Sequence, residues 1–548
     1  MVLVALCLTQ KAKSDTIATA LKEGIIMKKK KETIFSTYKT MLTEEFRGYN
    51  GKRLLKDLLA GLTVAAVALP LALAFGAASV GQSYAQIGIM AGLITAILAG
   101  IITALFGGAS YQISGPTGAM TVVLSGIVGG AYGLNGMFIA CLIAGIILFV
   151  AGILNLGKLI RFIPKPVIVG FTSGIAIVIA LGQLGNFFGV SLEGETTLDK
   201  VIFFFTDTLK NISLSAVICS VAVTAFMFLF PKKWGKIIPA SLVSIILATA
   251  VVALLPDSIK ISTIGNIPSS LINEVRLDFS GLNFKMIGDL ISPAITIALL
   301  GLVESLLCGS CAANMTKKPF ESRAELLAQG LGNIVVPLFG GVPSTAAIAR
   351  TSVAVRAGCQ TRLTSVFQSL FLIVCMFLLS PVIALVPYPA LAGVLIATAW
   401  RMNEWHEIKS YFKRKQWDAI ALFLVTMIAT VLLDLTYAII IGVVLAFIIM
   451  IARQTFARTN VTELENETIV SPEGSLFFSN VKNLCERITK IETNAITIDA
   501  TKLTYIDVTA TDELKESFDT ITENGKTIRI INASENVKAQ LEKSGITL

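Results

Sequence analysis

Residues 58–157 begin LLAGLTVAAVALPLALAFGAASV (58–80) and continue to Gly157 without a single Asp, Glu, Lys or Arg. The run of 100 residues is bounded by Asp57 and Lys158. A soluble domain covers its surface with charged residues, whereas a membrane-spanning helix needs about 20 consecutive apolar residues. The run therefore predicts about four membrane spans. It excludes a soluble enzyme, a nucleic-acid binder and a disordered scaffold as descriptions of the whole chain.

The rest of the chain continues this pattern, because 54% of its 548 residues are hydrophobic and only 15% are charged. Soluble domains carry about 25% charged residues. Fourteen apolar runs can be counted, and each is expected to form one membrane span. These spans lie near 57–80, 85–107, 115–130, 134–156, 166–188, 211–230, 237–255, 288–312, 324–339, 343–357, 361–386, 389–400, 417–433 and 436–453.

The charges between the spans alternate in a way that predicts sidedness. Lys and Arg gather after the even-numbered spans, whereas the loop after span five carries Glu193, Glu195 and Asp199. By the positive-inside rule, both termini are expected on the cytoplasmic side of a bacterial-type inner membrane. The basic loop residues are Lys158, Arg161, Lys165, Lys232, Lys233, Lys236, Lys317, Lys318, Arg323, Arg356, Arg362, Arg401, Lys409, Lys413, Arg414, Lys415, Arg453 and Arg458.

Spans three and ten are interrupted by glycine and proline. The third begins SGPTGAM (114–120) and the tenth begins FGGVPST (339–345). Such residues indicate a helix that starts late, after an extended segment, and each span is third in a set of seven. Matching interruptions are the sequence pattern expected of a transporter site between inverted repeats, here 51–256 and 285–455. Ordinary kinks at helix ends are the alternative, but they do not explain the matching positions.

The two ends of the chain differ from this membrane region, which we expect over 51–455. Residues 1–50 are expected to form a cytoplasmic N-terminal segment. Within it, 1–26 precede a second methionine in MKKKK (27–31) and are interpreted as an upstream-start artefact or a disordered tail. Residues 460–548 hold 9 Lys and Arg against 15 Asp and Glu, and strand-like and helical patterns alternate. This alternation predicts a small soluble α/β domain.

Several motifs together resemble one family of membrane proteins. DLLAGLTVAAVALPLALAF (57–75), SGPTGAM, GLVESLL (301–307) and GGVPSTAAIART (340–351) are similar to the SulP family of anion transporters, and the tail resembles its STAS domain. The resemblance implies a seven-plus-seven inverted repeat with a core and a gate domain. It also implies a homodimer and an anion site between the facing N-termini of spans three and ten, which would be half-helices.

Two helix N-termini that meet in the membrane can bind a small anion through the backbone alone. Each end offers unpaired N–H groups and about half a positive charge. The residues expected to supply donors at this site are Thr117, Gly118 and Ala119 on span three, and Ser344, Thr345, Ala346 and Ala347 on span ten.

Arg350 follows these donors within span ten, and an arginine inside a membrane is costly and usually functional. The matching family residue borders the anion site, so Arg350 is expected to bind substrate. A structural ion pair, or a side chain that reaches the membrane surface, is the alternative. The resemblance also assigns Phe75 on span one to the substrate pocket, where packing against lipid or core is the alternative reading.

Glu304 is the only charged residue between Asp289 and Lys317, so it lies in the middle of span eight. The resemblance places it at an acidic position associated with cation coupling, by a proton or a sodium ion. Some sodium-coupled relatives have an Asp there and a hydroxyl residue one turn later, where this chain has Cys308, which is counted with Glu304 as a candidate ion-coupling residue. This difference favours protons. A purely structural pairing of Glu304 with Arg350 is the alternative.

The remaining motifs predict no cofactor and no metal. Cys308 and Cys311 form one C-x-x-C pair without a second pair, and His406 is the sole histidine. In the tail, Asp507 and Thr509 resemble the loop before a STAS helix, where they are candidate regulatory residues or simple helix caps. Val508 occupies the position of the phosphorylated serine of related proteins, which argues against phosphorylation at that position.

The leading functional hypothesis is secondary-active transport of a small anion through an elevator-like movement. Sulfate, bicarbonate and dicarboxylates all fit, and coupling to H⁺ or Na⁺ is expected rather than enzyme chemistry. An uncoupled exchanger or channel on the same fold is one alternative, and a membrane-tethered STAS regulator is another. A nucleobase permease shares the architecture but usually lacks a STAS tail. The expected partners are the anion, the lipid bilayer and a second copy of the chain, with no nucleic acid.

Overall fold

The computed structural model of the chain describes residues 34–546, apart from 159–162, 193–196, 209–210, 232–233, 235–238, 257–258, 260, 266–269, 281, 434, 456–458 and 478–479. The segment 1–26 therefore lies outside the described residues. So do several of the loop charges used to predict sidedness, including Arg161, Glu193, Glu195 and Arg458.

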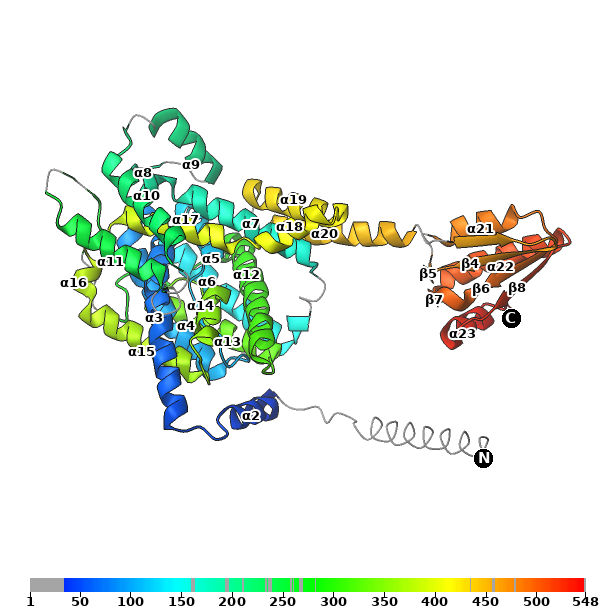
Figure 1. The fold of residues 1–548 in the computed structure, drawn as a ribbon, viewed down its shortest axis with the longest axis horizontal. Helices are drawn as coiled ribbons and strands as arrows, with labels where there is room; N and C mark the ends of the chain where they lie inside the picture. Colours follow the sequence, from blue (N-terminus) through cyan, green and yellow to red (C-terminus); the bar gives the residue numbers. More distant parts are fainter. Residues whose placement is uncertain are drawn as a thin grey trace. The chain divides into compact units, whose positions relative to one another are not determined.

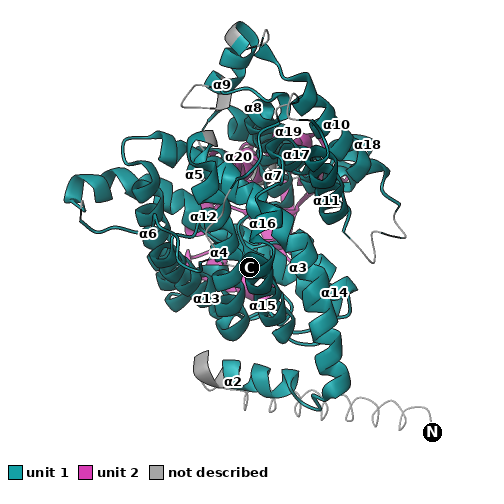
Figure 2. Cartoon of the chain, turned by 90° about the vertical axis from the view of Figure 1, so that its left-hand side faces the viewer, with its two compact units in different colours: residues 1–415, 423–439 teal, residues 416–422, 440–548 magenta. Residues whose placement is uncertain are grey.

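The described chain separates into two compact units, coloured separately in Figure 2. The first consists of 1–415 and 423–439, and the second of 416–422 and 440–548. The helices up to residue 253 are α2 (Ile34–Glu45), α3 (Gly51–Val80), α4 (Ala85–Phe106), α5 (Gly118–Gly129), α6 (Gly133–Ile153), α7 (Lys165–Gly182), α8 (Leu184–Phe188), α9 (Thr197–Phe203), α10 (Leu214–Leu229) and α11 (Ala240–Ala253).

The later helices complete the membrane region (Figure 1). They are α12 (Phe284–Thr316), α13 (Ser322–Val335), α14 (Ile348–Arg356), α15 (Leu363–Leu378), α16 (Ser380–Ile383), α17 (Tyr388–Met402), α18 (Trp405–Lys413), α19 (Trp417–Leu432) and α20 (Leu435–Thr455). A helix lies at each of the predicted spans. The amphipathic helix α18 was not predicted, because its charged residues were read as a basic loop.

Length and composition identify five described helices as able to cross a membrane, and shorter apolar helices accompany them. The five are Gly51–Val80, Ala85–Phe106, Gly133–Ile153, Lys165–Phe188 and Phe284–Ala313. Apolar side chains on several helices are largely exposed, such as Leu254 at 86% and Leu229 at 80%, as expected of surfaces that face lipid. The number of crossings and the inverted repeat stay predictions.

Two short strands join the segments that the sequence singled out. Strand β1 (Ser114–Gly115) pairs antiparallel with β2 (Thr345–Ala346), so that Ser114 lies opposite Ala346 and Gly115 opposite Thr345. Each strand is followed almost at once by a helix, α5 after β1 and α14 after β2. Both helices begin later than the predicted spans, at residues 118 and 348 rather than 115 and 343. The prolines 116 and 343 explain the extended backbone, because proline disfavours helix at the residue before it.

Helix α13 packs very closely against α6 because glycines line the contact. A Cβ atom on Gly330 would lie 2.5 Å from the backbone nitrogen of Phe149, and one on Gly145 would lie 2.7 Å from the carbonyl carbon of Asn333. Small residues allow membrane helices to approach backbone to backbone, where dispersion contacts replace the hydrophobic effect. This contact makes α13 a firm support for the strands beside it.

The C-terminal residues form the α/β fold that their alternating pattern predicted. Strands β3 (Thr459–Glu463), β4 (Glu467–Pro472), β6 (Ala495–Asp499) and β8 (Thr527–Ile531) form one sheet in that order. The first pair is antiparallel and the other two are parallel. A second, parallel pair joins β5 (Gly474–Leu476) to β7 (Leu503–Ile506), and the helices are α21 (Val481–Thr489), α22 (Val508–Glu523) and α23 (Glu535–Lys543).

Candidate functional site

The candidate site is built around the starts of α5 and α14. Thr117 and Ala347 precede these helices, and neither side chain caps the helix with a hydrogen bond. The β1–β2 pairing, extended by a bond from Ala347 N to Ile113 O at 2.9 Å, holds the two helix starts together although about 230 residues separate them. The first-turn N–H groups of both helices have no intrahelical acceptor and are therefore available to an anion.

Helix α12 links these two starts through two adjacent residues. Thr117 Oγ1 donates to Glu304 Oε2 at 3.0 Å, which ties the residue before α5 to the predicted coupling carboxylate. Next to it, Ser305 Oγ lies 3.0 Å from Thr345 Oγ1 and accepts a hydrogen bond from Ala346 N at 3.3 Å. Glu304 and Ser305 therefore connect α12 to the residue before α5 and to strand β2, which precedes α14.

Arg350 reaches from α14 back to the connection between β1 and α5. Its side chain is 1% exposed, and Nη2 donates to Pro116 O at 2.7 Å. Nη1 has no hydrogen-bond partner among the described residues, and a Cβ on Gly115 would lie only 2.4 Å from it. Glycine at 115 therefore makes room for the guanidinium, which keeps an unused donor beside two helix N-termini.

Arg350 and Glu304 do not pair directly, which bears on the structural alternative for both. Within the part of the chain that the structure describes, the ion pairs do not include either residue. The two charges still lie near enough to attract each other electrostatically. The guanidinium instead bonds a backbone carbonyl and the carboxylate bonds a hydroxyl, so neither charge is neutralised by a direct partner.

Phe75 lies beside the first turn of α5, and Ala119 belongs to that turn. The ring of Phe75, which is 5% exposed, would be 3.1 Å from a Cβ atom placed on Gly118. Ile179 would be nearer still, at 2.5 Å, so a larger residue at position 118 would require the outer ends of the Ile179 and Phe75 side chains to shift. Ala119 is fully buried. These residues form an apolar wall around the N-terminus of α5.

The predicted backbone donors on span ten need correction. The N–H groups of three predicted residues bond within the protein: Ser344 to Asn333 Oδ1 at 2.7 Å, Ala346 to Ser305, and Ala347 to Ile113. The physical reason is that these residues form the extended strand segment, whose amides are used by neighbours. The free N–H groups of this helix belong instead to its first turn, Ile348, Ala349 and Arg350.

Cys308 has a structural role in the described contacts. Its thiol is fully buried and donates to Thr351 Oγ1 at 3.2 Å, and Thr351 Oγ1 in turn accepts from Ile113 N at 3.0 Å. The thiol therefore helps to hold α14 against the segment before β1. The described cysteines are free thiols, and no cluster of His, Cys, Asp or Glu among the described residues could hold a metal.

Sequence reasoning missed three polar residues that support the site: Ser305, Gln329 and Asn333. All three are fully buried. Ser305 directly follows Glu304, and Gln329 and Asn333 follow Glu325 at intervals of four residues within a predicted span. Polar residues at helical spacing inside a predicted span were the signal that could have revealed them.

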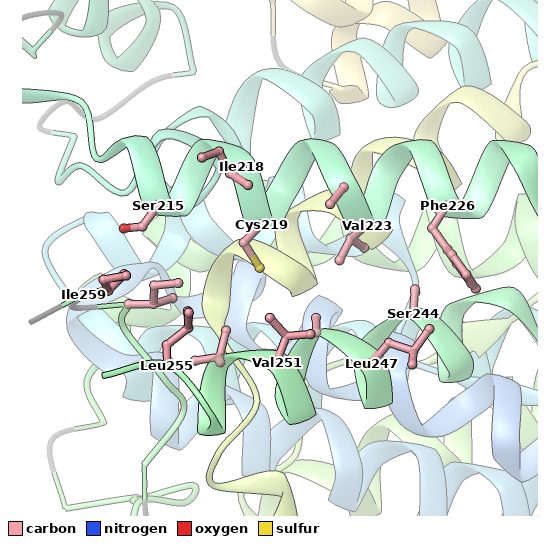
Figure 3. A pocket seen from close by; sticks show the side chains of 14 residues that line it. Ser215, Ile218, Cys219, Val223, Phe226, Ser244, Leu247, Val251, Leu255 and Ile259 are labelled. Carbon is pink, nitrogen blue, oxygen red and sulfur yellow. The ribbon is translucent and has the colours of Figure 1, made fainter. Parts of the chain in front are cut away.

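A separate cavity of about 380 Å³ lies between α10 and α11 (Figure 3). Its lining is almost entirely apolar, and the labelled side chains of Cys219 and Val251 point into it. An anion needs hydrogen-bond donors or positive charge, whereas the lining residues include no Lys, Arg or His and only two hydroxyls, those of Ser215 and Ser244. It is therefore not the candidate anion site.

In the C-terminal unit, Asp507 is the N-cap of α22. Its side chain accepts a hydrogen bond from Ala510 N at 2.7 Å. Thr509 lies in the first turn of α22 and is exposed. Asp507 thus has a helix-capping role in the structure, and regulation at either residue stays a prediction.

Two family models match the chain. The model of the sulfate permease family matches residues 54–426, and the model of the STAS domain matches residues 458–547. Over 521 residues the chain is 33% identical to the putative sulfate transporter YvdB of Bacillus subtilis strain 168, covering 91% of this chain and 96% of that protein. It is 28% identical over 520 residues to the bicarbonate transporter BicA of a Picosynechococcus strain, covering 89% and 90%.

Solved structures agree in fold. The transmembrane domain of a cyanobacterial bicarbonate transporter BicA superposes with a TM-score of 0.64 at 28% identity, covering 71% of this chain and 98% of that one. The murine Slc26a9 anion transporter in its inward-facing state gives a TM-score of 0.81 at 16% identity, covering 96% and 94%. At that identity the second match shows the fold alone.

The fold and these matches show that the chain is a multi-pass helical membrane protein with the fold of an anion transporter and a C-terminal STAS domain. The chain belongs to the sulfate permease family.

Proposed function

We propose that the chain is a secondary-active transporter of a small anion, with sulfate and bicarbonate as the first candidates. The observation that carries this proposal is Arg350. Its buried guanidinium retains an N–H without a partner among the described residues and lies beside the starts of two helices. A buried charge with an unused donor is costly unless a ligand completes its contacts. The names of the matched relatives, sulfate and bicarbonate transporters, support the same class of substrate.

The anion in this proposal is bound by the N–H groups of the first turns of α5 and α14, together with Arg350. The residues that line this site are Phe75, Thr117, Gly118, Ala119, Ser344, Thr345, Ala346 and Ala347, with the strand residues of span ten as supports rather than donors. Backbone dipoles favour a small anion without the rigid ligand set that would slow its release.

Coupling in this proposal depends on Glu304. The carboxylate accepts a hydrogen bond from the hydroxyl of Thr117, the residue that precedes α5. Protonation of Glu304 would remove a negative charge next to the anion, so a proton and the anion can bind together. A sodium ion beside the carboxylate would have the same electrostatic effect. The thiol of Cys308 donates a hydrogen bond to Thr351, so we propose that Cys308 stabilises the site rather than holds a cation.

The proposed architecture follows the sequence pattern. Residues 51–455 form a fourteen-span transport domain of two inverted repeats, 51–256 and 285–455, with half-helices at spans three and ten. Residues 460–548 form the STAS domain. An elevator-like movement, a homodimer and cytoplasmic termini in a bacterial inner membrane complete the proposal. Single cysteines placed by Leu192→Cys and Trp234→Cys should label from opposite sides of the membrane, and labelling from the same side would contradict the span order.

The test is transport by the full chain reconstituted into vesicles. Labelled sulfate uptake should be competed by the preferred anion among sulfate, bicarbonate, succinate and chloride, and it should respond to a pH or sodium gradient. Uptake that is indifferent to both gradients would identify an uncoupled exchanger or channel. Vesicles that take up none of these anions, despite folded protein, would overturn the proposal.

A further inference from the structure

Three polar side chains form a line along one face of α13. Glu325, Gln329 and Asn333 follow each other at intervals of four residues, so they lie one above another on the helix. All three are essentially inaccessible, at 1%, 0% and 0% exposure. Polar residues so deeply buried in a membrane helix need hydrogen-bond partners. We call these three residues the α13 ladder.

Asn333 holds the segment that leads into β2. Its Oδ1 accepts from Ser344 N at 2.7 Å and its Nδ2 donates to Ser344 O at 2.9 Å. The amide therefore pairs with both backbone groups of Ser344, as a neighbouring strand would. Nδ2 also donates to Gln329 O at 3.0 Å, which fixes the amide against its own helix.

Gln329 holds the other strand. Its Nε2 donates to Ser114 Oγ at 2.7 Å and to Glu325 Oε1 at 2.9 Å. Ser114 is the first residue of β1 and is fully buried. Glu325 then accepts from Gly108 N at 3.1 Å, in the loop between α4 and β1. One face of α13 thus forms hydrogen bonds with the segments that precede α5 and α14.

The support beneath the ladder is rigid. Gly145 and Gly330 bring α6 and α13 into backbone contact, and the thiol of Cys141 lies 3.3 Å from Asn333 O. Side chains whose own positions are locked by packing can hold a site within a fraction of an ångström. The two strands themselves are short: their pairing consists of two residue pairs, extended by the bond from Ala347 N to Ile113 O.

We propose that Gln329 and Asn333 are positioning residues that set the spacing between the N-termini of α5 and α14, and thereby the affinity and size selectivity for the anion. This inference rests on the proposed function. The residues act through Ser114 and Ser344 and do not touch the anion. Loss of such supporting contacts commonly weakens ligand binding on the order of ten-fold or more.

The experiment compares Asn333→Leu and Gln329→Leu with Gln368→Leu in the full chain reconstituted into vesicles. Gln368 on α15 is a matched control, because it is also a fully buried glutamine and its side-chain amide has no hydrogen-bond partner among the described residues. The two ladder variants should raise the KM for sulfate, or for bicarbonate if the wild type prefers it, by about ten-fold with a smaller change in kcat. They should also flatten the preference among anions of different size.

A double variant tests whether Gln329 acts through Ser114. If Gln329 works by holding Ser114, then Gln329→Leu combined with Ser114→Ala should raise KM no further than the single variants, because the two changes remove the same contact. Additive effects would show that Gln329 acts by another route.

Hydrogen exchange separates failure of the ladder from failure of the proposed function. Without any substrate, Asn333→Leu should speed exchange in residues 340–350, and Gln329→Leu should do so in 108–118, while α15 stays unchanged. A wild type that transports no anion would overturn the proposed function, yet exchange would still decide whether the ladder holds the strands. The ladder proposal is overturned if exchange in both segments stays at the wild-type rate, or if KM and selectivity follow those of Gln368→Leu.

Discussion

Two buried arginines of the membrane region differ in whether a carboxylate contacts them, although each has one terminal nitrogen without a hydrogen-bond partner among the described residues, Nη2 in Arg362 and Nη1 in Arg350. Arg362, between α14 and α15, bonds Glu45 Oε2 through Nε at 3.0 Å, and its backbone N–H bonds Glu45 Oε1 at 2.6 Å. Its Nη1 donates to Ala104 O at 3.0 Å. Arg350 has no carboxylate partner among the described residues and bonds only the carbonyl of Pro116. The first arginine is neutralised within the fold, whereas the second keeps its charge.

This difference supports the proposal that Arg362 is structural and that Arg350 binds the anion. Arg362 joins helix α2, the loop after α4 and the start of α15, and Asp57 reinforces the same region by accepting from Thr361 and Thr364 hydroxyls at 2.7 and 2.9 Å. A buried charge whose partner belongs to the protein stabilises a particular arrangement of helices. A buried charge without one provides a place for an anion. The sequence alone had read Arg362 as a loop charge on the cytoplasmic side.

The largest expected effect is on stability. Glu45→Ala leaves the Arg362 guanidinium buried without its counter-charge, which should lower the free energy of unfolding by about 3–5 kcal/mol. Thermal unfolding in detergent measures this loss. The control is Glu407→Ala, which removes the exposed ion pair with Lys165 and should barely change the melting temperature. Equal effects of the two substitutions would remove the basis for treating the Arg362 pair as structural.

The second effect should fall on binding rather than on stability. Arg350→Ala removes the one unneutralised buried cation of the site and should weaken the apparent affinity for the anion by roughly 30-fold or more. Arg356→Ala, on the exposed end of the same helix, is the matched control and should leave the affinity near wild type. Uptake at varied anion concentration measures both. An Arg350→Ala protein with wild-type affinity would make this arginine structural as well.

A third, smaller effect on affinity is expected at Glu304. Glu304→Gln keeps an oxygen that can accept from Thr117, so the affinity should change by less than about ten-fold. The glutamine cannot bind or release a proton. The variant should therefore no longer accumulate the anion against its concentration gradient, while exchange of anions across the membrane continues. Parallel assays of accumulation and of exchange distinguish these outcomes. Accumulation at the wild-type level would remove Glu304 from coupling.

The smallest effect is expected at an exposed arginine pair in the C-terminal unit. Arg529 Nη2 bonds Glu467 Oε1 at 2.9 Å. Hydrogen bonds from Thr497 and then from Arg529 hold the pKa of Glu467 below its ordinary value. A carboxylate whose pKa is lowered in the folded state stabilises the fold at pH values above its pKa in the unfolded state, which is about 4.3 for Glu. This stabilisation disappears as the pH falls through the pKa of the folded state.

Glu467→Gln should therefore change hydrogen exchange in strands β4, β6 and β8 only slightly at pH 7. The variant should also lack the loss of stability that protonation of Glu467 causes at acidic pH. Solvent screens an exposed pair, so the change must be much smaller than that of Glu45→Ala. An effect as large as that of Glu45→Ala would break the distinction between buried and exposed arginine pairs.

Local pattern explains why much of the fold could be predicted. Apolar runs located the helices, and glycine with proline located the late starts of α5 and α14, because these signals depend on neighbouring residues only. The same reasoning placed backbone donors at Ser344, Ala346 and Ala347, whose amides are in fact used by the strand and its neighbours. Helix α18 was missed because charged residues conceal an amphipathic helix when they are counted as a loop.

By itself, then, the sequence determined that this is a membrane protein, where its helices lie, which family it belongs to and that two of its charged residues, Arg350 and Glu304, lie within apolar spans. Only the tertiary structure decided that these two charges are not directly paired, that Arg362 is buried against Glu45, and that α13 bonds to both strands. The physical reason is distance along the chain. Glu45 and Arg362 are 317 residues apart, and Ser114 and Gln329 are 215 apart, so no local periodicity can report which side chain meets which.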